Sequence, residues 1–160
     1  MQKILRSIIP ILLFVTLTAC GKDGSSQIAT PWLEHETLGE ACCAVNFNMT
    51  FPEHIDGYSD PIFRTLYQEI IEIIYPAVDD EICIRKYASA EDRIQDFGGI
   101  EAYPYGGYAT EAEHCYQVLG TDPDTINLVS WGDDAYHFIF FCKNGFTDSD
   151  ALFDMIHQVK

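Results

Sequence analysis

The sequence predicts an α+β fold, in which helices pack on one face of a small, mostly antiparallel sheet in the order β-α-β-α-α-β-β-α. The chain has 160 residues, 48% of them hydrophobic, which is enough for one domain with one buried core. Apolar residues alternate with polar ones in some segments and recur at helical spacing in others. Turn and capping residues separate these segments, and no internal repeat or second-domain linker interrupts them.

The first expected strand covers residues 44–51. Its apolar residues occupy every second position and are Val45, Phe47, Met49 and Phe51. The same alternation predicts that Cys43 faces the core and Cys42 the polar side. Pro52 ends the strand.

The strongest expected helix covers residues 61–75. Asp60 is a suitable N-cap, and Pro61 suits the first helical position, where its missing N–H is not needed. The residues at helical spacing are Ile62, Leu66, Ile70, Ile73 and Ile74. Pro76 ends this helix.

The middle of the chain predicts one strand and two shorter helices. Residues 81–87 (EICIRKY) read as a strand, and residues 90–97 as a short helix that Gly98 terminates. A capping box of Thr110 and Glu113 predicts a second helix over 111–119.

The C-terminal part predicts a hairpin and a last helix. Strands over 126–131 and 135–143 flank Gly132-Asp133-Asp134, a sequence that favours a tight connection. The second strand is apolar on both faces, which indicates a central position in the sheet. Thr147 is the expected cap of the last helix.

The N-terminus has the layout of a cleavable export signal. Lys3 and Arg6 precede an apolar run over 8–15 that is shorter than the roughly 20 residues a membrane-spanning helix needs. The tetrad over 17–20, Leu-Thr-Ala-Cys, resembles the lipobox of bacterial lipoproteins; the alternative is an ordinary secretory signal with a chance cysteine. The resemblance implies lipidation of Cys20 and a membrane-anchored place in the cell envelope. Gly21 after the cysteine favours the outer membrane over the inner one.

This interpretation divides the chain into three parts. Residues 1–19 are the expected signal peptide, 20–37 a lipidated flexible tether of small and polar residues, and 38–160 a single α+β domain.

The charge restricts the classes of partner. The chain has nine basic and 25 acidic residues, and loss of residues 1–19 removes Lys3 and Arg6 and no acid, which changes the net charge from −16 to −18. Phosphate backbones and anionic lipid surfaces would be repelled, so the sequence argues against nucleic-acid binding and against membrane contact beyond the anchor. It permits a basic protein partner.

Five cysteines follow Cys20, at positions 42, 43, 83, 115 and 142. Export to an oxidising compartment permits disulfides, and the odd number leaves at least one thiol unpaired. Two bonds among five cysteines allow 15 connectivities, between which the sequence does not choose, and five buried or exposed thiols are the other possibility.

The sequence contains no metal-binding or cofactor motif. His114 and Cys115, with His137 and Cys142, could supply a Cys/His nucleophile or a zinc site. However, neighbouring residues on the expected helix point about 100° apart, and His137 and Cys142 fall on opposite faces of their strand. The sequence therefore predicts no metal, no cofactor and no catalytic residue. Its acidic pairs read as helix caps and turns.

The best binding candidate is the segment GGIEAYPYGGY over 98–108, expected as a loop. Tyr103, Tyr105 and Tyr108 alternate with glycines and would offer amphipathic contact area to a protein or a sugar. The alternative is that these tyrosines only cover the edge of the sheet.

Two functions follow as hypotheses. The first is a lipid-anchored, non-enzymatic acidic binding protein of the bacterial envelope, as an inhibitor or immunity-type protein for a basic partner or as an accessory subunit of an envelope complex. The second is a small envelope hydrolase or metal-dependent enzyme that uses His114 and His137.

Overall fold

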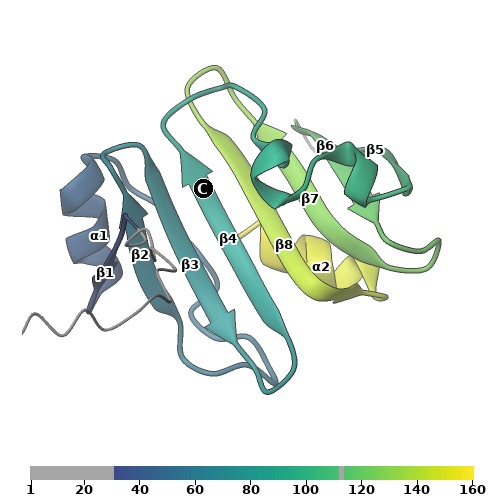
Figure 1. Ribbon diagram of the computed structural model, residues 1–160, viewed down its shortest axis with the longest axis horizontal. Coiled ribbons are helices and arrows are strands. Elements are labelled where there is room, and N and C mark those ends of the chain that lie inside the picture. The colour runs from purple at the N-terminus through teal and green to yellow at the C-terminus, as the bar shows by residue number, and fades with distance from the viewer. Residues whose placement is uncertain (1–30, 112–113) are drawn as a thin grey trace, which may run out of the picture. The chain divides into compact units, whose positions relative to one another are not determined.

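The computed structural model describes residues 31–111 and 114–160, which form one antiparallel sheet with a few short helices (Figure 1). The strands lie side by side in the order β1-β2-β3-β4-β8-β7-β6-β5. The elements are β1 (Trp32–His35), α1 (Leu38–Val45), β2 (Ile62–Leu66), β3 (Ile70–Pro76), β4 (Glu81–Tyr87), η1 (Ile94–Phe97), η2 (Ile100–Ala102), β5 (Tyr105–Glu111), β6 (His114–Gly120), β7 (Ile126–Gly132), β8 (His137–Phe146) and α2 (Ser149–Ile156).

The sheet consists of two four-stranded meanders that meet in its centre. β1 to β4 run from one edge inwards, and β5 to β8 run from the other edge inwards. β4 and β8 join the two halves, with Ile84 opposite Phe140 in the register. The segment 88–104, which contains η1 and η2, connects β4 to the far edge.

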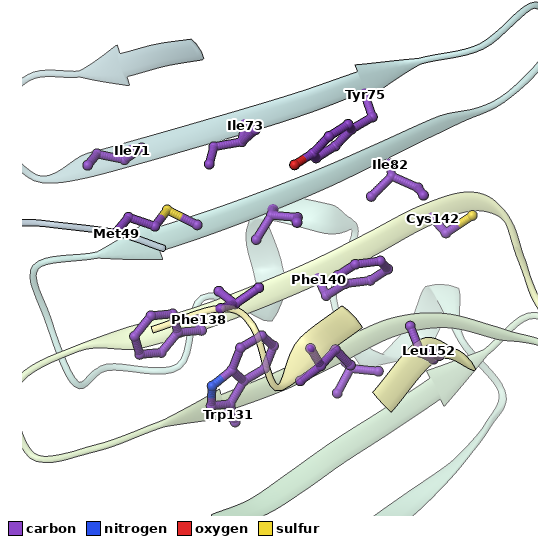
Figure 2. Packing of buried hydrophobic residues seen from close by; sticks show 14 of the residues in the cluster. Met49, Ile71, Ile73, Tyr75, Ile82, Trp131, Phe138, Phe140, Cys142 and Leu152 are labelled. Carbon is purple, nitrogen blue, oxygen red and sulfur yellow. The ribbon is translucent and has the colours of Figure 1, made fainter. Parts of the chain in front are cut away.

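Both faces of the sheet are covered. On one side, here called the helical face, strand residues such as Ile73, Ile84 and Phe140 share a buried cluster with Val45 of α1 and Leu152 of α2 (Figure 2). On the other side, here called the crossover face, the segment 88–104 places Ile94 and Tyr103 in a smaller cluster with the strand residues Ile70, Tyr87, Leu119, Leu128 and Ile139. The central strands are therefore buried on both sides.

The predicted α+β class with helices on a small sheet is wrong. Eight strands dominate the described chain, and α1 and α2 have only eight residues each. The physical reason is that a strand buried on both faces has no alternating pattern, so its run of apolar residues also matches a helix.

The predicted helix over 61–75 is the β2–β3 hairpin. Tyr67, with φ of 53°, lies in its turn. Ile62, Leu66, Ile70 and Ile74 are spaced by four residues, which places them on one face of a strand pair as well as on one face of a helix. The remaining isoleucines of β3 fill the opposite face, and β-branched side chains favour the strand.

The predicted helix over 111–119 is also wrong, because residues 114–120 are β6. β6 pairs with β5 on one side and with β7 on the other. Thr110 lies opposite Cys115 in the β5–β6 register, so the expected capping residue is part of a strand. Two rows of ladder hydrogen bonds outweigh one local capping signal.

The predicted strand over 44–51 is wrong in its secondary structure. α1 occupies its first part, begins at the N-cap Thr37, whose hydroxyl accepts from the Glu40 N–H at 3.2 Å, and ends at Asn46 with φ of 63°. In this helix Cys43 is exposed and Cys42 is half-buried, the reverse of the prediction. The alternation of buried and exposed residues continues beyond the helix, without a strand, to Met49.

Other local predictions are confirmed. β4 covers residues 81–87, β7 and β8 form the expected hairpin, and β8 lies in the centre of the sheet.

Three predictions hold only in part. The last helix exists, but its N-cap is Asp148 rather than Thr147. The short helix over 90–97 is reduced to η1, which Gly98 ends with φ of 96°. β1 lies within the stretch that the sequence assigned to the tether, and no helix of the described residues is long and apolar enough to span a membrane.

Candidate functional site

The segment expected as a binding loop, 98–108, contains η2 and, from Tyr105 onward, the first four residues of strand β5. Tyr103 precedes it and is buried, with 7% of its surface exposed, and its hydroxyl donates to the Phe97 carbonyl at 2.9 Å. Tyr105 and Tyr108 are 47% and 76% exposed. Because three positions separate them on a strand, they lie on opposite faces of the sheet. The three tyrosines therefore do not form one patch, and Tyr103 is a core residue.

β5 is an edge strand. It pairs with β6 over seven residues, and no described segment pairs with its other side. The register runs without interruption from Tyr105 opposite Gly120 to Glu111 opposite His114. The opposite edge of the sheet, β1, has only four residues.

A shallow groove of about 490 Å³ runs along β5. Its walls include Tyr105 and Ala109 of β5, Val118 of β6, Ile126 of β7 and Phe153 of α2. Asp122 is the only carboxylate among its described lining residues, and no lysine or arginine is among them.

Two adjacent glycines of β5 have different roles. A Cβ on Gly106 would lie 2.5 Å from the Val118 carbonyl oxygen, so this glycine permits the close approach of β6. A Cβ on Gly107 would meet nothing within 4 Å. The space beside Gly107 is therefore open, and packing inside the domain does not account for this glycine.

On the crossover face, His137 contacts two possible catalytic partners. Ser130 Oγ and His137 Nε2 are 3.0 Å apart and both side chains are buried, whereas Asp92 Oδ1 lies 3.8 Å from the same Nε2. A serine-histidine-carboxylate triad needs the carboxylate on Nδ1, where it orients the ring and stabilises the imidazolium. The observed arrangement places serine and carboxylate on one nitrogen, so it does not form this relay.

The acid stability of the fold should depend on His137. Burial lowers the pKa of His137 below its ordinary value of 6.5; the charge of Asp92 opposes this shift and that of Arg93 adds to it. As the pH falls below about 6.5, the unfolded chain takes up a proton at this residue before the folded chain does, so the free energy of unfolding decreases. We expect the free energy of unfolding of His137→Asn to decrease less steeply than that of the unmodified chain as the pH falls through this window. Urea unfolding at a series of pH values measures both. Parallel pH profiles for the two proteins would contradict the assignment.

The sheet separates the other candidate residues. His114 shares its side of β6 with Tyr116 of the helical-face cluster, whereas His137 faces the crossover side, so the two histidines of the hydrolase hypothesis do not converge. Cys115 is exposed beside a hollow on the crossover face. Among the described residues no three His, Cys, Asp or Glu side chains are arranged to hold a metal ion, and cysteines 42, 43, 83, 115 and 142 are all free thiols.

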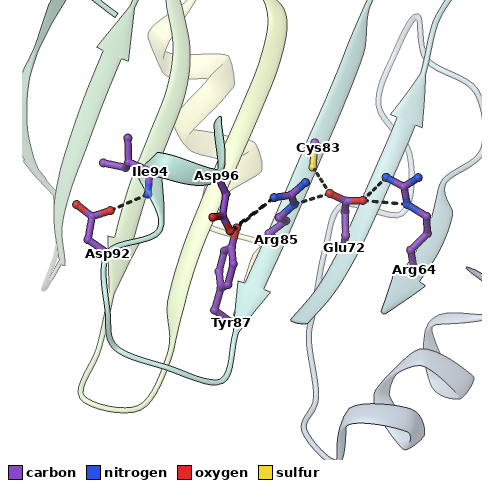
Figure 3. Close-up of polar contacts among 8 residues, drawn as sticks. All are labelled: Arg64, Glu72, Cys83, Arg85, Tyr87, Asp92, Ile94 and Asp96. Carbon is purple, nitrogen blue, oxygen red and sulfur yellow. Dashed lines mark hydrogen bonds and ion pairs between the residues drawn. The ribbon is translucent and has the colours of Figure 1, made fainter. Parts of the chain in front are cut away.

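Two of the chain's few basic side chains form ion pairs with a buried carboxylate. Glu72, whose side chain is 1% exposed, lies between Arg64 and Arg85 (Figure 3). Arg64 Nε donates to Glu72 Oε1 at 2.9 Å, Arg85 Nε donates to Oε2, and the Cys83 thiol donates to Oε2 at 3.1 Å. The Trp32 ring covers this cluster, with its centroid 5.2 Å from the guanidinium carbon of each arginine. The buried Glu72 carboxylate thus balances part of the charge of two arginines whose side chains are only 27% and 15% exposed.

Lys86 is also directed inward, on the helical face. Its Nζ donates to the Asn48 carbonyl at 2.6 Å, and three aromatic rings, Tyr136, Phe138 and Phe47, lie 4.2, 5.2 and 5.7 Å from the ammonium group. Burial lowers its pKa from the ordinary value, and the negative charge of Asp133 opposes this shift. Cation–π contacts and one carbonyl replace its hydration shell.

The outer surface is therefore more acidic than the composition indicates. Of nine basic residues, Lys3, Arg6 and Lys22 precede residue 31, which leaves six; of 25 acidic residues, only Asp23 does, which leaves 24. Three of the six, namely Arg64, Arg85 and Lys86, are the inward-directed side chains described above, and Glu72 is the only fully buried acid among the described side chains. The sequence did not lead us to predict this inward placement of basic side chains. Arg85 and Lys86, which occur within the apolar segment EICIRKY, were the residues that could have indicated it.

A scan of protein-family models, a search of curated proteins and a search of solved structures found no match to this chain.

Proposed function

We propose that this chain is a lipid-anchored, non-enzymatic acidic binding protein of the bacterial cell envelope that captures a basic protein, as an inhibitor or immunity-type protein would. The observation that carries the proposal is the segregation of charge. The fold directs half of the domain's basic residues inward and leaves almost all of its carboxylates in solvent.

The energetics of folding alone do not favour such a surface. Self-repulsion among like charges destabilises a compact chain, whereas an excess of one sign increases the rate at which a partner of opposite sign associates. Complementary charge also excludes wrong partners, because like charges brought together at an interface are repelled. Attraction of a basic partner would account for the acidic excess of this surface.

The anchor follows from the lipobox resemblance at residues 17–20, which lie outside the described residues. We expect Cys20→Ser to abolish lipid attachment and to move most of the protein from the membrane fraction to the soluble fraction, or to leave the signal peptide uncleaved. Fractionation and the mass of the mature chain measure this. Cys43→Ser, which changes an exposed cysteine of the described domain, is the control and should fractionate normally. Normal processing and fractionation of Cys20→Ser would contradict the proposed anchor.

Capture experiments test the partner. The immobilised full-length chain should retain basic proteins from an envelope extract at about 0.05 M salt and release most of them at about 0.5 M, because salt screens the attraction between oppositely charged surfaces. For a purified captured protein, the association rate constant should fall at least about tenfold over this range. Retention of neutral or acidic proteins that is insensitive to salt, or no retention, would contradict the proposal.

A further inference from the structure

We infer that the free edge of β5 is a docking site for an extended, basic peptide segment, which joins the sheet as a further strand beside β5. This inference rests on the proposed capture of a basic partner and names the surface that would hold it.

The edge of β5 has the hydrogen-bonding groups that such a strand needs. In an antiparallel ladder every second residue exchanges its bonds with the neighbouring strand, and the residues between them direct N–H and C=O groups outward. β5 keeps an unbroken register with β6 along all seven residues, so its outward groups form a regular row. Addition of an extended segment to such a row is a recurrent way to recognise peptides.

Among the described residues, β5 lacks three common protections of an edge strand, namely lysine, proline and a bulge. Natural sheets interrupt exposed edges with lysine, proline, a bulge or a very short strand. The sequence YGGYATE contains neither lysine nor proline, its one charged residue is Glu111 at the end of the strand, and its pairing with β6 shows no register shift. The other edge has the last of these protections, since β1 is four residues long.

Gly107 and the groove provide room for the side chains of the added strand. A glycine inside a strand frequently marks a place where another backbone or a ligand approaches closely. A side chain at Gly107 would project into free space on the face where Tyr105 and Phe153 line the groove. On the opposite face Tyr108, which is 76% exposed, would cover the alternate side chains of the same segment.

Charge selects the occupant. The groove carries Asp122 and no basic residue among its described lining residues, and the surrounding domain has 24 acidic and six basic residues. A second copy of this chain would bring the same acidic surface to the edge and would be repelled. A segment in which lysine or arginine alternates with apolar residues would satisfy both the carboxylates and the groove.

The test uses synthetic peptides and the full-length chain. The probe is a fluorescent peptide of about eight residues in which lysine and valine alternate, long enough to cover β5. Its matched control has the same sequence and charge, but alternate amides are N-methylated and therefore cannot donate hydrogen bonds. We expect the N-methylated peptide to bind at least tenfold more weakly. On binding of the unmodified peptide, we expect slower hydrogen exchange at amides of β5.

A pair of substitutions at Gly107 separates charge from space. Gly107→Lys and Gly107→Glu add side chains of comparable length at a position where a Cβ meets nothing within 4 Å, so both should fold. Both side chains fill the space beside Gly107 and should weaken binding of the alternating peptide. Gly107→Lys, which also adds a charge of the same sign as the peptide, should bind it at least tenfold more weakly than Gly107→Glu does. Leu33→Lys adds the same charge to the exposed opposite edge and should leave binding unchanged.

Each alternative outcome is distinct. Equal affinity for the two peptides, or equal affinity of Gly107→Lys and Leu33→Lys, would overturn docking at β5 even if basic proteins are still captured in a salt-sensitive way. A dimer that Gly107→Lys abolishes would overturn it in favour of pairing between copies of this chain. Loss of all salt-sensitive capture would instead contradict the proposed function itself.

Discussion

Replacement of Glu72 by alanine is expected to lower the free energy of unfolding by about 3–5 kcal/mol. The substitution leaves Arg64 without its carboxylate partner and Arg85 with only the more distant Asp96, whose Oδ2 lies 3.9 Å from Arg85 Nη1, and the Trp32 ring still limits the access of both arginines to water. An uncompensated charge in such a place costs far more than the loss of a solvent-exposed ion pair, which typically costs less than 1 kcal/mol. Urea unfolding followed by tryptophan fluorescence and circular dichroism measures the change.

Two controls make this prediction specific. Glu69→Ala removes an exposed carboxylate from the same hairpin and should change stability by less than about 0.5 kcal/mol. The triple replacement Arg64→Met, Glu72→Leu and Arg85→Met removes all three charges together. It should recover most of the stability that Glu72→Ala loses, because well-packed apolar residues can substitute for a buried ion cluster. A loss below 1 kcal/mol in Glu72→Ala would show that the two arginines find other partners.

Phe140→Ala is expected to cost about 3–5 kcal/mol, the range for removal of a large buried ring. Phe140 is 1% exposed and lies in β8, opposite Ile84 of β4 and Val129 of β7. Its ring also contacts Phe146, with centroids 5.8 Å apart. The substitution therefore opens a cavity where the two meanders meet, which neighbouring strands can fill only in part.

The adjacent residue provides the matched comparison. Phe141 points to the crossover face, is only half-buried and contacts Phe97 at a centroid distance of 5.0 Å. Phe141→Ala should cost less than half as much as Phe140→Ala, because solvent already reaches its ring. Thermal unfolding of both variants decides the point. Equal losses would mean that the helical face does not contain the main core.

Local signals in the sequence determined several elements correctly. The short segment 81–87, with the apolar run Ile82-Cys83-Ile84, forms β4 as predicted, and the Gly132-Asp133-Asp134 connection closes the β7–β8 hairpin. The apolar pattern on both faces of β8 indicated its central position. These predictions depend on residues close together in the chain, where turn chemistry and periodicity are direct physical causes.

The candidate site could be predicted only in part. The sequence identified the tyrosine-glycine segment, but it treated Tyr103, Tyr105 and Tyr108 as equivalent residues of a loop. Residues 105–108 belong to the edge strand β5, which places Tyr105 and Tyr108 on opposite faces, whereas Tyr103 precedes β5 and is buried in the crossover-face cluster. The alternation of a strand was visible in YGGYATE only weakly, because glycine has no side chain to mark a face.

The sequence by itself determined the acidic excess and the strands with strong local patterns, since each of these is a property of composition or of neighbouring residues. The export signal at residues 1–20 stays a prediction from the sequence. Only the tertiary structure decided that residues 62–76 form a hairpin rather than a helix, that β5 is an open edge, and that Arg64, Arg85 and Lys86 turn inward. The physical reason is that ladder hydrogen bonds and burial join residues far apart in the chain, such as Ile84 and Phe140. The free energy of these long-range contacts outweighs the local preference for a helix that an isoleucine-rich segment shows by its spacing.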